Sequence, residues 1–395
     1  MRAVNLFCLF LRLKLVKKNK IIYNIRIMFR NELKNVPVYV PGKPIEEVVK
    51  EYNLDKDKVI KLASNENPLG ASRYALEAIK NSLENIRLYP ESDSIDLRKV
   101  LAKHLSLKED EIIIGRGSDE VIQMLSKATL NGEDEIIVSD PTFSVYEITA
   151  TIMGAKTVKV PLKNDFTQDL EKIAKKISDK TKIIYLTNPH NPTGSINNIA
   201  EMKEFLSKIP QNIIVAMDEA YAEYVESTDY PCSLDFLALG YKNIVGLRTF
   251  SKIYGLAGLR VGYGFTTNND IMNALYKVKE PFNISNIGQA AAIASILDEE
   301  QVIKSKLINS EGKIYLTQEL KKLGFMPHST QSNFILVNIF RPVKPLIEAL
   351  QRRGVIVRNC NSFGLDTCFR VTISTYSQNK QFIDELADAI HKGEW

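Results

Sequence analysis

The sequence has few cysteines, no long uncharged apolar segment and no internal repeat. Its four cysteines (Cys8, Cys232, Cys360 and Cys368) show neither the pair spacing of a metal site nor the density of a disulfide framework. We therefore expect no bound metal and a reduced, cytoplasmic location. Low-complexity tracts and long linkers are also absent, which argues against disordered or repeat architectures.

Acidic residues are absent from the first 30 residues, which carry eight lysines and arginines. Arg12 and Lys14 interrupt the apolar stretch, so it is too short and too charged to span a bilayer, and we expect no membrane partner. The stretch also lacks serine and the small-residue cleavage site of a signal peptide. We expect translation to start at Met28, which would make residues 1–27 a mis-assigned extension; a targeting peptide is the alternative.

Charge is nearly balanced in the rest of the chain. The formal net charge is +5, but without the first 30 residues the chain holds 44 of its 52 basic residues against 47 acidic ones, a net charge of −3. This balance favours no nucleic-acid partner. With 395 residues, 45% hydrophobic and 25% charged, the chain is long enough for a large globular domain and a smaller one.

Short β-branched runs alternate with amphipathic stretches from about residue 57 onward. Continuous apolar strands between helices indicate a mostly parallel sheet covered on both faces, an α/β architecture. The predicted strands lie at residues 111–115, 134–140, 182–188, 212–220 and 243–250. After about residue 285 a long helical run (287–322) precedes further strands and helices, which we expect to form a smaller α+β unit.

Polar residues follow these strands at the places where ligands bind in open α/β sheets. The segment "RGSDE" after the first strand offers free backbone N–H groups at a helix start, which suit a phosphate, although they could simply cap a structural helix. Glu120 stands where a dinucleotide-binding fingerprint needs its third glycine. "PHNPTG" follows another strand and could be only a turn.

A carboxylate and a lysine end the next two strands. Asp218 lies at the predicted mouth of the sheet, where it must be structurally paired or face a cationic ligand. Lys252 follows Ser251 in a glycine-containing loop and could be merely solvated. Taken together, the strand ends match what pyridoxal phosphate requires: a lysine for a Schiff base, a carboxylate for the ring nitrogen and anchors for the phosphate.

The chain resembles the fold-type I pyridoxal-phosphate aminotransferases, specifically the histidinol-phosphate aminotransferase family, from Asn35 to the C-terminus. The motifs that carry this resemblance are specific in their order and spacing: "NVPVYVPGKP" (35–44), "KLASNENPLG" (61–70), "LYPE" (88–91), "GRGSDE" (115–120), "PTFSVYE" (141–147), "NPHNPTG" (188–194), "DEAYAEY" (218–224), "FSKIYGLAGLRVGY" (250–263), "EPFNIS" (280–285), "SNFILV" (332–337) and "FRVTIS" (369–374).

The resemblance implies an α/β fold with a mostly parallel seven-stranded sheet and four segments. These are the extension (1–27), an N-terminal arm and part of the small domain (28–60), a large cofactor-binding domain (61–285) and a small C-terminal domain (286–395). His190 stands where the family commonly has asparagine, and we expect it to serve the turn or to tune the site.

The resemblance also implies roles for individual residues. Lys252 would form the Schiff base and move the substrate proton, Asp218 would pair with the ring nitrogen, and Asn191 and Tyr221 would bind the ring's hydroxyl oxygen. Phe143 would stack on the ring. The phosphate would be held by Gly117, Ser118, Asp119, Ser251 and Arg260, and by Tyr89 of a second subunit, which implies a homodimer. Substrate would contact Arg370, with Tyr39, Asn67, Asn191 and Arg358 as further candidates.

The activity implied by the resemblance transfers an amino group between L-histidinol phosphate and 2-oxoglutarate, a step of histidine biosynthesis. The products are imidazole-acetol phosphate and glutamate, and the two half-reactions would share one site in a ping-pong mechanism. Two alternatives are an aromatic-amino-acid aminotransferase and a threonine-phosphate decarboxylase. A cofactor-sensing transcription regulator is disfavoured, because thirty N-terminal residues cannot contain a DNA-binding winged helix.

Overall fold

Short, continuous apolar runs build most of the larger of two sheets. The computed structural model describes residues 30–36, 38 and 42–395, and its seven-stranded sheet has the order β2-β8-β7-β6-β5-β3-β4. The strands from β3 to β7 are parallel, whereas β8 runs antiparallel to both of its neighbours. Their bounds are β2 (Ile112–Gly115), β3 (Glu135–Asp140), β4 (Lys156–Pro161), β5 (Thr181–Thr187), β6 (Ile214–Asp218), β7 (Ile244–Thr249) and β8 (Gly262–Phe265).

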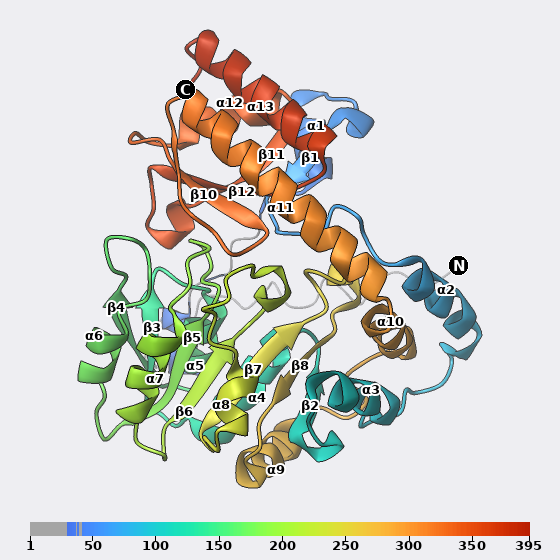
Figure 1. The fold of residues 1–395 in the computed structure, drawn as a ribbon, viewed down its shortest axis with the longest axis vertical. Coiled ribbons are helices and arrows are strands. Elements are labelled where there is room, and N and C mark those ends of the chain that lie inside the picture. The colour runs from blue at the N-terminus through green and yellow to red at the C-terminus, as the bar shows by residue number, and fades with distance from the viewer. Residues whose placement is uncertain (1–29, 37, 39–41) are drawn as a thin grey trace, which may run out of the picture.

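Helices cover both faces of this sheet, as the apolar strands require. Successive residues of one strand point to opposite faces, so in β5 Ile184 and Leu186 join one core cluster while Ile183 and Tyr185 join another. The first cluster takes side chains from α3 (Ile95–Leu105), α6 (Leu170–Lys175), α7 (Ile199–Ser207) and α8 (Ser233–Ala238). The second takes them from α4 (Ser118–Thr129), α5 (Val145–Ile152) and α9 (Asn269–Val278). Figure 1 shows α7 and α8 in front of the sheet and α4 and α5 behind it.

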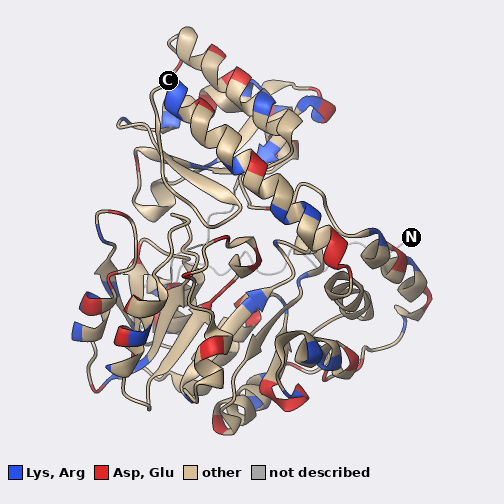
Figure 2. Cartoon of the chain, in the orientation of Figure 1, with Lys and Arg blue, Asp and Glu red and all other residues tan. Residues whose placement is uncertain are grey.

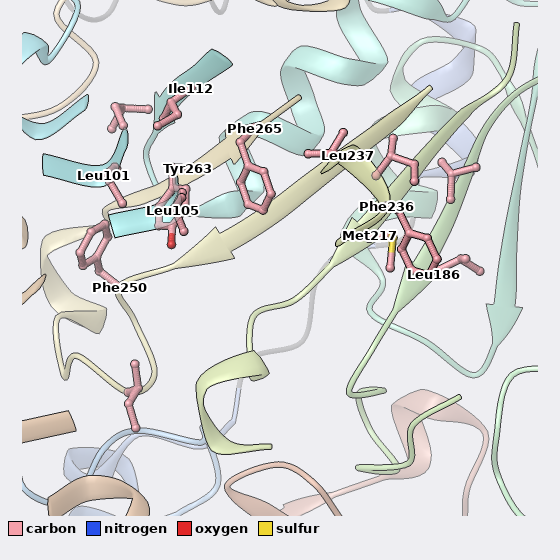
Figure 3. Packing of buried hydrophobic residues seen from close by; sticks show 14 of the residues in the cluster. Leu101, Leu105, Ile112, Leu186, Met217, Phe236, Leu237, Phe250, Tyr263 and Phe265 are labelled. Atoms are coloured by element: carbon pink, nitrogen blue, oxygen red, sulfur yellow. The ribbon is translucent and has the colours of Figure 1, made fainter. Parts of the chain in front are cut away.

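Large side chains fill the first cluster along the whole sheet. Figure 3 shows Leu186 and Met217 beside Phe236 and Leu237, at one end of the cluster. At the other end, Leu101 and Leu105 of α3 lie near Phe250 and Tyr263. Buried side chains of this size anchor the carboxyl ends of β5, β6 and β7, from which the loops that carry the candidate site residues start.

A five-stranded sheet forms the smaller unit, in the order β1-β11-β12-β10-β9. Its strands are β1 (Ile60–Leu62), β9 (Met326–Pro327), β10 (Phe334–Asn338), β11 (Val355–Asn359) and β12 (Cys368–Thr372). The helices around it are α1 (Ile45–Tyr52), α12 (Lys344–Arg352), α13 (Tyr376–His391) and part of α11 (Glu299–Lys322). Figure 1 shows this unit above the large sheet, with α11 running between the two.

Two features of the predicted organisation are corrected by the structure. The long helical run expected over 287–322 is divided into two helices, α10 (Asn286–Ile296) and α11, because Asp298 accepts a hydrogen bond from the Gln301 N–H and starts a new helix. Strands β4 and β8 were missed, since β4 carries Lys156 and Lys159 on an edge and β8 is half glycine.

The expected domain boundaries remain a proposal. The packing favours moving the boundaries at the two ends of the large domain (61–285). Strand β1 begins at Ile60 and pairs with β11 of the small sheet. Helix α10 packs on α2 (Arg73–Ser82) and on α3, and its Ala291, Ala292 and Ile296 belong to the first cluster of the large unit. A division by packing would therefore end the large unit after α10.

The charged residues on the surface of the described part of the chain indicate no further class of binding partner. Lysines and arginines are mixed with acidic residues over the helices of both units in Figure 2. None of the helices in the described part of the chain is long and apolar enough to cross a membrane. Among the same residues, no cluster of three or more histidines, cysteines or carboxylates is arranged to hold a metal ion.

Candidate active site

A cavity of about 570 Å³ lies where the loops after the parallel strands face the small sheet. Loops after β2, β3, β5, β6 and β7 contribute to its lining, together with β11, β12 and residues 63–66 next to β1. The lining includes most of the residues singled out from the sequence: Gly117, Ser118, Asp119, Phe143, Asn191, Asp218, Tyr221, Ser251, Lys252, Arg260, Arg358 and Arg370. The structure thus brings together twelve positions that are spread over 254 residues of the sequence.

Asp218 is the last residue of β6 and is almost fully buried. Its Oδ2 accepts a hydrogen bond from the Tyr146 hydroxyl at 2.6 Å, and its Oδ1 accepts one from the Ala220 N–H at 3.1 Å. Burial raises the pKa of Asp218 to about 6, although these two hydrogen bonds favour the ionised form. Within the part of the chain that the structure describes, Asp218 forms no ion pair, so its charge lacks a cationic partner from the protein.

Lys252 lies in the turn that follows β7 and projects into the same cavity. Its Nζ donates to the Ser64 carbonyl oxygen at 3.1 Å and lies 5.7 Å from the centre of the Tyr221 ring. The Tyr221 hydroxyl in turn accepts a hydrogen bond from Asn65 Nδ2 at 3.0 Å. Asn65 has a φ of 58°, a conformation that asparagine adopts more readily than most residues.

The start of α4 forms a cradle of backbone N–H groups on one side of the cavity. Gly117 has a φ of 72° and precedes the first helical residue, Ser118, whose N–H has no partner within the helix. Arg260 Nη2 donates to Asp119 Oδ2 at 2.9 Å, which holds the guanidinium beside this loop. A Cβ at Gly117 would lie 3.0 Å from the same Nη2, so glycine lets the arginine approach the backbone.

Two arginines of the small sheet complete the cavity. Arg358 of β11 and Arg370 of β12 are cross-strand partners, so their side chains leave the sheet next to each other. Arg370 Nη1 donates to Asn191 Oδ1 at 2.5 Å and Nη2 donates to the Ala63 carbonyl oxygen at 3.1 Å. Arg358 Nη2 donates to Ser362 Oγ at 3.2 Å. The small unit therefore supplies two cations to a cavity whose other groups come mostly from the large one.

Two candidates, Asn67 and Tyr89, are not brought to this cavity, and a third cannot be placed. Asn67 Nδ2 is engaged by the Ile253 carbonyl oxygen at 2.6 Å and Ser305 Oγ at 2.9 Å, so its amide serves packing, and Asn65 lines the cavity instead. Tyr89 lies elsewhere, 82% exposed, and stacks on Phe282 with ring centres 4.8 Å apart. Tyr39 lies outside the described residues.

His190 is buried in the turn after β5 and is absent from the lining of the cavity. Its Nδ1 lies 2.9 Å from Thr193 Oγ1, within the same turn. Burial lowers the pKa of His190 to about 3, which keeps the ring neutral at ordinary pH. The structure therefore places His190 in the turn and away from the reacting groups.

Sequence reasoning missed several residues that the fold delivers to the cavity or directly behind it. Thr187, Asn65 and Glu147 line the cavity, and the Tyr146 hydroxyl contacts Asp218 from behind. Tyr146 and Glu147 lie within the quoted motif "PTFSVYE" (141–147), but the sequence does not show which strand end a given face of their helix will pack against.

The fold and the cavity are those of a fold-type I pyridoxal-phosphate transferase.

Comparisons with known proteins narrow this class. The sequence model of the family "Aminotransferase class I and II" matches residues 57–390. The histidinol-phosphate aminotransferase of Moorella thermoacetica is 46% identical over 361 residues, which are 91% of this chain and 92% of that protein. For the enzyme of the same name from Bacillus subtilis (strain 168) the identity is 40%, covering 91% of this chain and 99% of that protein.

Solved structures agree in fold. The histidinol-phosphate aminotransferase from Clostridium acetobutylicum has a TM-score of 0.79 at 26% identity, covering 85% of this chain and all of that one. The enzyme from Sinorhizobium meliloti, solved in complex with pyridoxal-5'-phosphate, has a TM-score of 0.84 at 23% identity and covers 93% of this chain and 98% of that one. The chain belongs to the aminotransferase class I and II family, and within it to the histidinol-phosphate aminotransferases.

The residues present fit pyridoxal phosphate on grounds independent of these comparisons. A protonated ring nitrogen would supply the cation that buried Asp218 lacks among the described residues. A phosphate would satisfy the N–H groups at the start of α4 and the Arg260 guanidinium. The Lys252 amine, which could react with the cofactor's aldehyde, lines the same cavity.

Proposed function

We propose that this protein transfers an amino group between L-histidinol phosphate and 2-oxoglutarate, with pyridoxal 5'-phosphate in the cavity. The observation that carries the proposal is that Lys252 and the buried Asp218 line one cavity together with the arginine pair of the small sheet. The bound cofactor would supply an electron sink for the carbanion left when the substrate's Cα–H bond breaks. The family relatives at 46% and 40% identity favour histidinol phosphate as the amino donor.

The residues of the large unit would hold the cofactor's ring and move the proton. Lys252 would bind the cofactor's aldehyde and then carry the proton between the substrate Cα and the cofactor C4′. Asp218 would keep the ring nitrogen protonated, because a buried carboxylate stabilises an adjacent cation. Asn191 and Tyr221 would bind the ring's hydroxyl oxygen, and Phe143 would pack on the ring face.

The cofactor's phosphate would occupy the cradle at the start of α4. Gly117, Ser118 and Asp119 would offer backbone N–H groups, where the helix dipole also favours an anion. Ser251 lines the same cavity and is oriented by Thr249, whose Oγ1 lies 3.0 Å from Ser251 Oγ. Arg260 would add a charge-assisted hydrogen bond.

The two arginines of the small sheet would bind the anionic ends of both substrates in turn. A guanidinium binds carboxylate and phosphate groups in the same bidentate manner, so Arg370 can serve the carboxylates of glutamate and the phosphate of histidinol phosphate. Arg358, its cross-strand neighbour, would provide the second charge that a dianionic phosphate favours. One site used alternately by two substrates gives ping-pong kinetics.

The exposed apolar surface around Tyr89 supports a homodimer. Leu83, Ile86, Leu88 and Phe282 lie near Tyr89 in sequence or by contact and are all between 45% and 67% exposed. A patch of this kind favours a protein partner, and a second copy would place Tyr89 at its partner's cofactor phosphate. The three free cysteines of the described residues are compatible with the cytoplasm, where we infer the enzyme works.

Mixed dimers test the dimer directly. A dimer of one Lys252→Ala and one Tyr89→Ala subunit contains one site with both native residues only if Tyr89 acts across the interface. We expect co-expressed, differently tagged subunits to recover up to half of the wild-type activity at limiting cofactor. A mixed dimer no better than the two parent variants would reject the role of Tyr89 in a partner's site.

The substrate is tested by the visible spectrum of the cofactor-loaded protein. Histidinol phosphate, phenylalanine and threonine phosphate are added separately, without an amino acceptor. We expect histidinol phosphate to convert the bound cofactor to its amine form at the lowest concentration. A response to phenylalanine alone would make an aromatic-amino-acid aminotransferase the better assignment, and carbon dioxide release from threonine phosphate would make it a decarboxylase.

A further inference from the structure

A tyrosine hydroxyl lies directly behind the carboxylate of Asp218. Tyr146, in the first turn of α5, is fully buried and does not line the cavity, whereas Asp218 does. The Tyr146 hydroxyl oxygen lies 2.6 Å from Asp218 Oδ2 and 3.0 Å from Thr187 Oγ1. Tyr146 therefore contacts Asp218 on the side away from the space that the cofactor would fill.

Aromatic packing fixes the direction of this hydroxyl. The Tyr146 ring stacks on Tyr185 with ring centres 4.4 Å apart and an interplanar angle of 13°. It also makes an edge-to-face contact with Phe143, with ring centres 5.7 Å apart and an interplanar angle of 85°. Offset stacking and edge-to-face contacts of this kind hold a ring in one orientation. The hydroxyl is therefore preorganised to point at Asp218 and needs no rearrangement when a cation arrives on the other side.

The direction of the hydrogen bond follows from the charges. Burial and the adjacent carboxylate both raise the pKa of Tyr146 well above its ordinary value, so the phenol keeps its proton and donates a hydrogen bond to Asp218. An O–H donor 2.6 Å from a carboxylate oxygen forms a charge-assisted hydrogen bond, about twice as strong as a neutral one. Such a bond favours the ionised form of the acid that accepts it.

We propose that Tyr146 is a positioning residue, whose hydroxyl keeps Asp218 ionised and aimed at the cavity. The proton between Asp218 and the cofactor's ring nitrogen would then stay on the nitrogen. This inference rests on the proposed function, because it needs the cofactor in the cavity. A carboxylate without its donor is more basic, and in a buried site it competes better with the ring nitrogen for that proton. A ring nitrogen that loses the proton is a weaker electron sink.

The test replaces the hydroxyl and follows the proton itself. In Tyr146→Phe the ring and its stacking on Tyr185 are kept. Tyr185→Phe is the matched control, because it removes a hydroxyl from the same stack but none of the hydrogen bonds to Asp218. Each protein is loaded with pyridoxal phosphate labelled with ¹⁵N in the ring, and the nitrogen chemical shift is recorded.

We expect the ¹⁵N signal of Tyr146→Phe to move toward the value of an unprotonated pyridine, and that of Tyr185→Phe to stay at the wild-type position. The value of kcat should fall by about 10-fold to 100-fold while KM changes little, as a lost hydrogen bond to a charged group implies. A wild-type nitrogen shift in cofactor-loaded Tyr146→Phe, or an equal change in both variants, would overturn the proposal.

A double-mutant cycle separates positioning from packing. The Asp218→Asn background lacks the carboxylate that Tyr146 would keep ionised. Adding Tyr146→Phe there should therefore lower kcat by clearly less than it does in the wild type. Equal effects in the two backgrounds would mean that Tyr146 acts through packing, which also overturns the proposal. Thr187→Val, which removes the other partner of the Tyr146 hydroxyl, gives a smaller change in the same direction if Tyr146→Phe proves insoluble.

The two proposals fail separately. The nitrogen shift is measured before any substrate is added, so it reports on Tyr146 whichever substrate the enzyme uses. A wild-type protein that ignores histidinol phosphate but shows the expected shifts would reject the substrate and keep the role of Tyr146. The reverse result would keep the substrate and reject that role.

Discussion

Replacing Gly262 by alanine tests the phosphate cradle without touching any side chain of the site. Gly262 is the first residue of β8 and packs against the loop that enters α4. A Cβ at this position would lie 2.4 Å from the Ser118 nitrogen and 2.5 Å from the Gly117 carbonyl carbon. Both atoms are backbone, so no rotation of a side chain can relieve the contact, and the proposed phosphate-binding loop must move.

The size of the effect follows from these distances. Non-bonded heavy atoms separate by about 3.5 Å, so the loop has to shift by roughly 1 Å. Overpacking of this kind costs about 1 to 3 kcal/mol of stability. A displacement of about 1 Å at a binding or reacting group can lower function by about 100-fold. We expect the Kd for pyridoxal phosphate to rise by about 10-fold to 100-fold, which corresponds to about 1.4 to 2.8 kcal/mol.

The assay titrates the cofactor-free protein with pyridoxal phosphate and follows the absorbance of the bound form. Gly258→Ala is the control, because a Cβ at Gly258 meets nothing within 4 Å in the described structure and Gly258 has no positive φ. Thermal unfolding of both cofactor-free variants separates lost stability from lost binding. If Gly262→Ala binds the cofactor as tightly as Gly258→Ala, the start of α4 does not hold the phosphate.

Three further outcomes are expected. Lys252→Ala should bind the cofactor without a covalent bond that borohydride can trap and should lose transamination; mass spectrometry and rate assays check this, and substantial turnover would reject Lys252 as the nucleophile. Burial raises the pKa of Asp218 to about 6 against about 3.9 for an unfolded aspartate, so the native cofactor-free protein binds the proton more tightly and loses stability as pH rises from about 4 to about 6. Asp218→Asn should therefore stabilise it by roughly 2 to 3 kcal/mol at pH 8 and by little at pH 4, and unfolding curves with the same difference at both pH values would contradict this. Arg370→Gln should raise KM for both glutamate and histidinol phosphate by about 10-fold or more, and a change for only one of them would contradict a shared anion site.

The strands that the sequence predicted are those with uninterrupted apolar runs. Strands β2, β3, β5, β6 and β7 are buried on both faces, so their pattern does not depend on which neighbour they pair with. The edge strand β4 and the glycine-rich β8 lack that pattern, and only pairing with their neighbours makes them strands. The break between α10 and α11 was missed because residues 286–322 contain no proline, and only the cap at Asp298 marks the start of the second helix.

The sequence by itself determined the class of the protein and the strand ends at which its chemistry would lie. Lys252 and Asp218 could be chosen because parallel strands bring their carboxyl ends to one edge of the sheet. Only the tertiary structure decided that Asn65, and not Asn67, lines the cavity, that Arg358 stands beside Arg370, and that a tyrosine hydroxyl backs Asp218. The reason is physical: the order of the apolar runs along the chain and their spacing are local properties, whereas a contact between a helix face and a strand end exists only after distant segments have packed together.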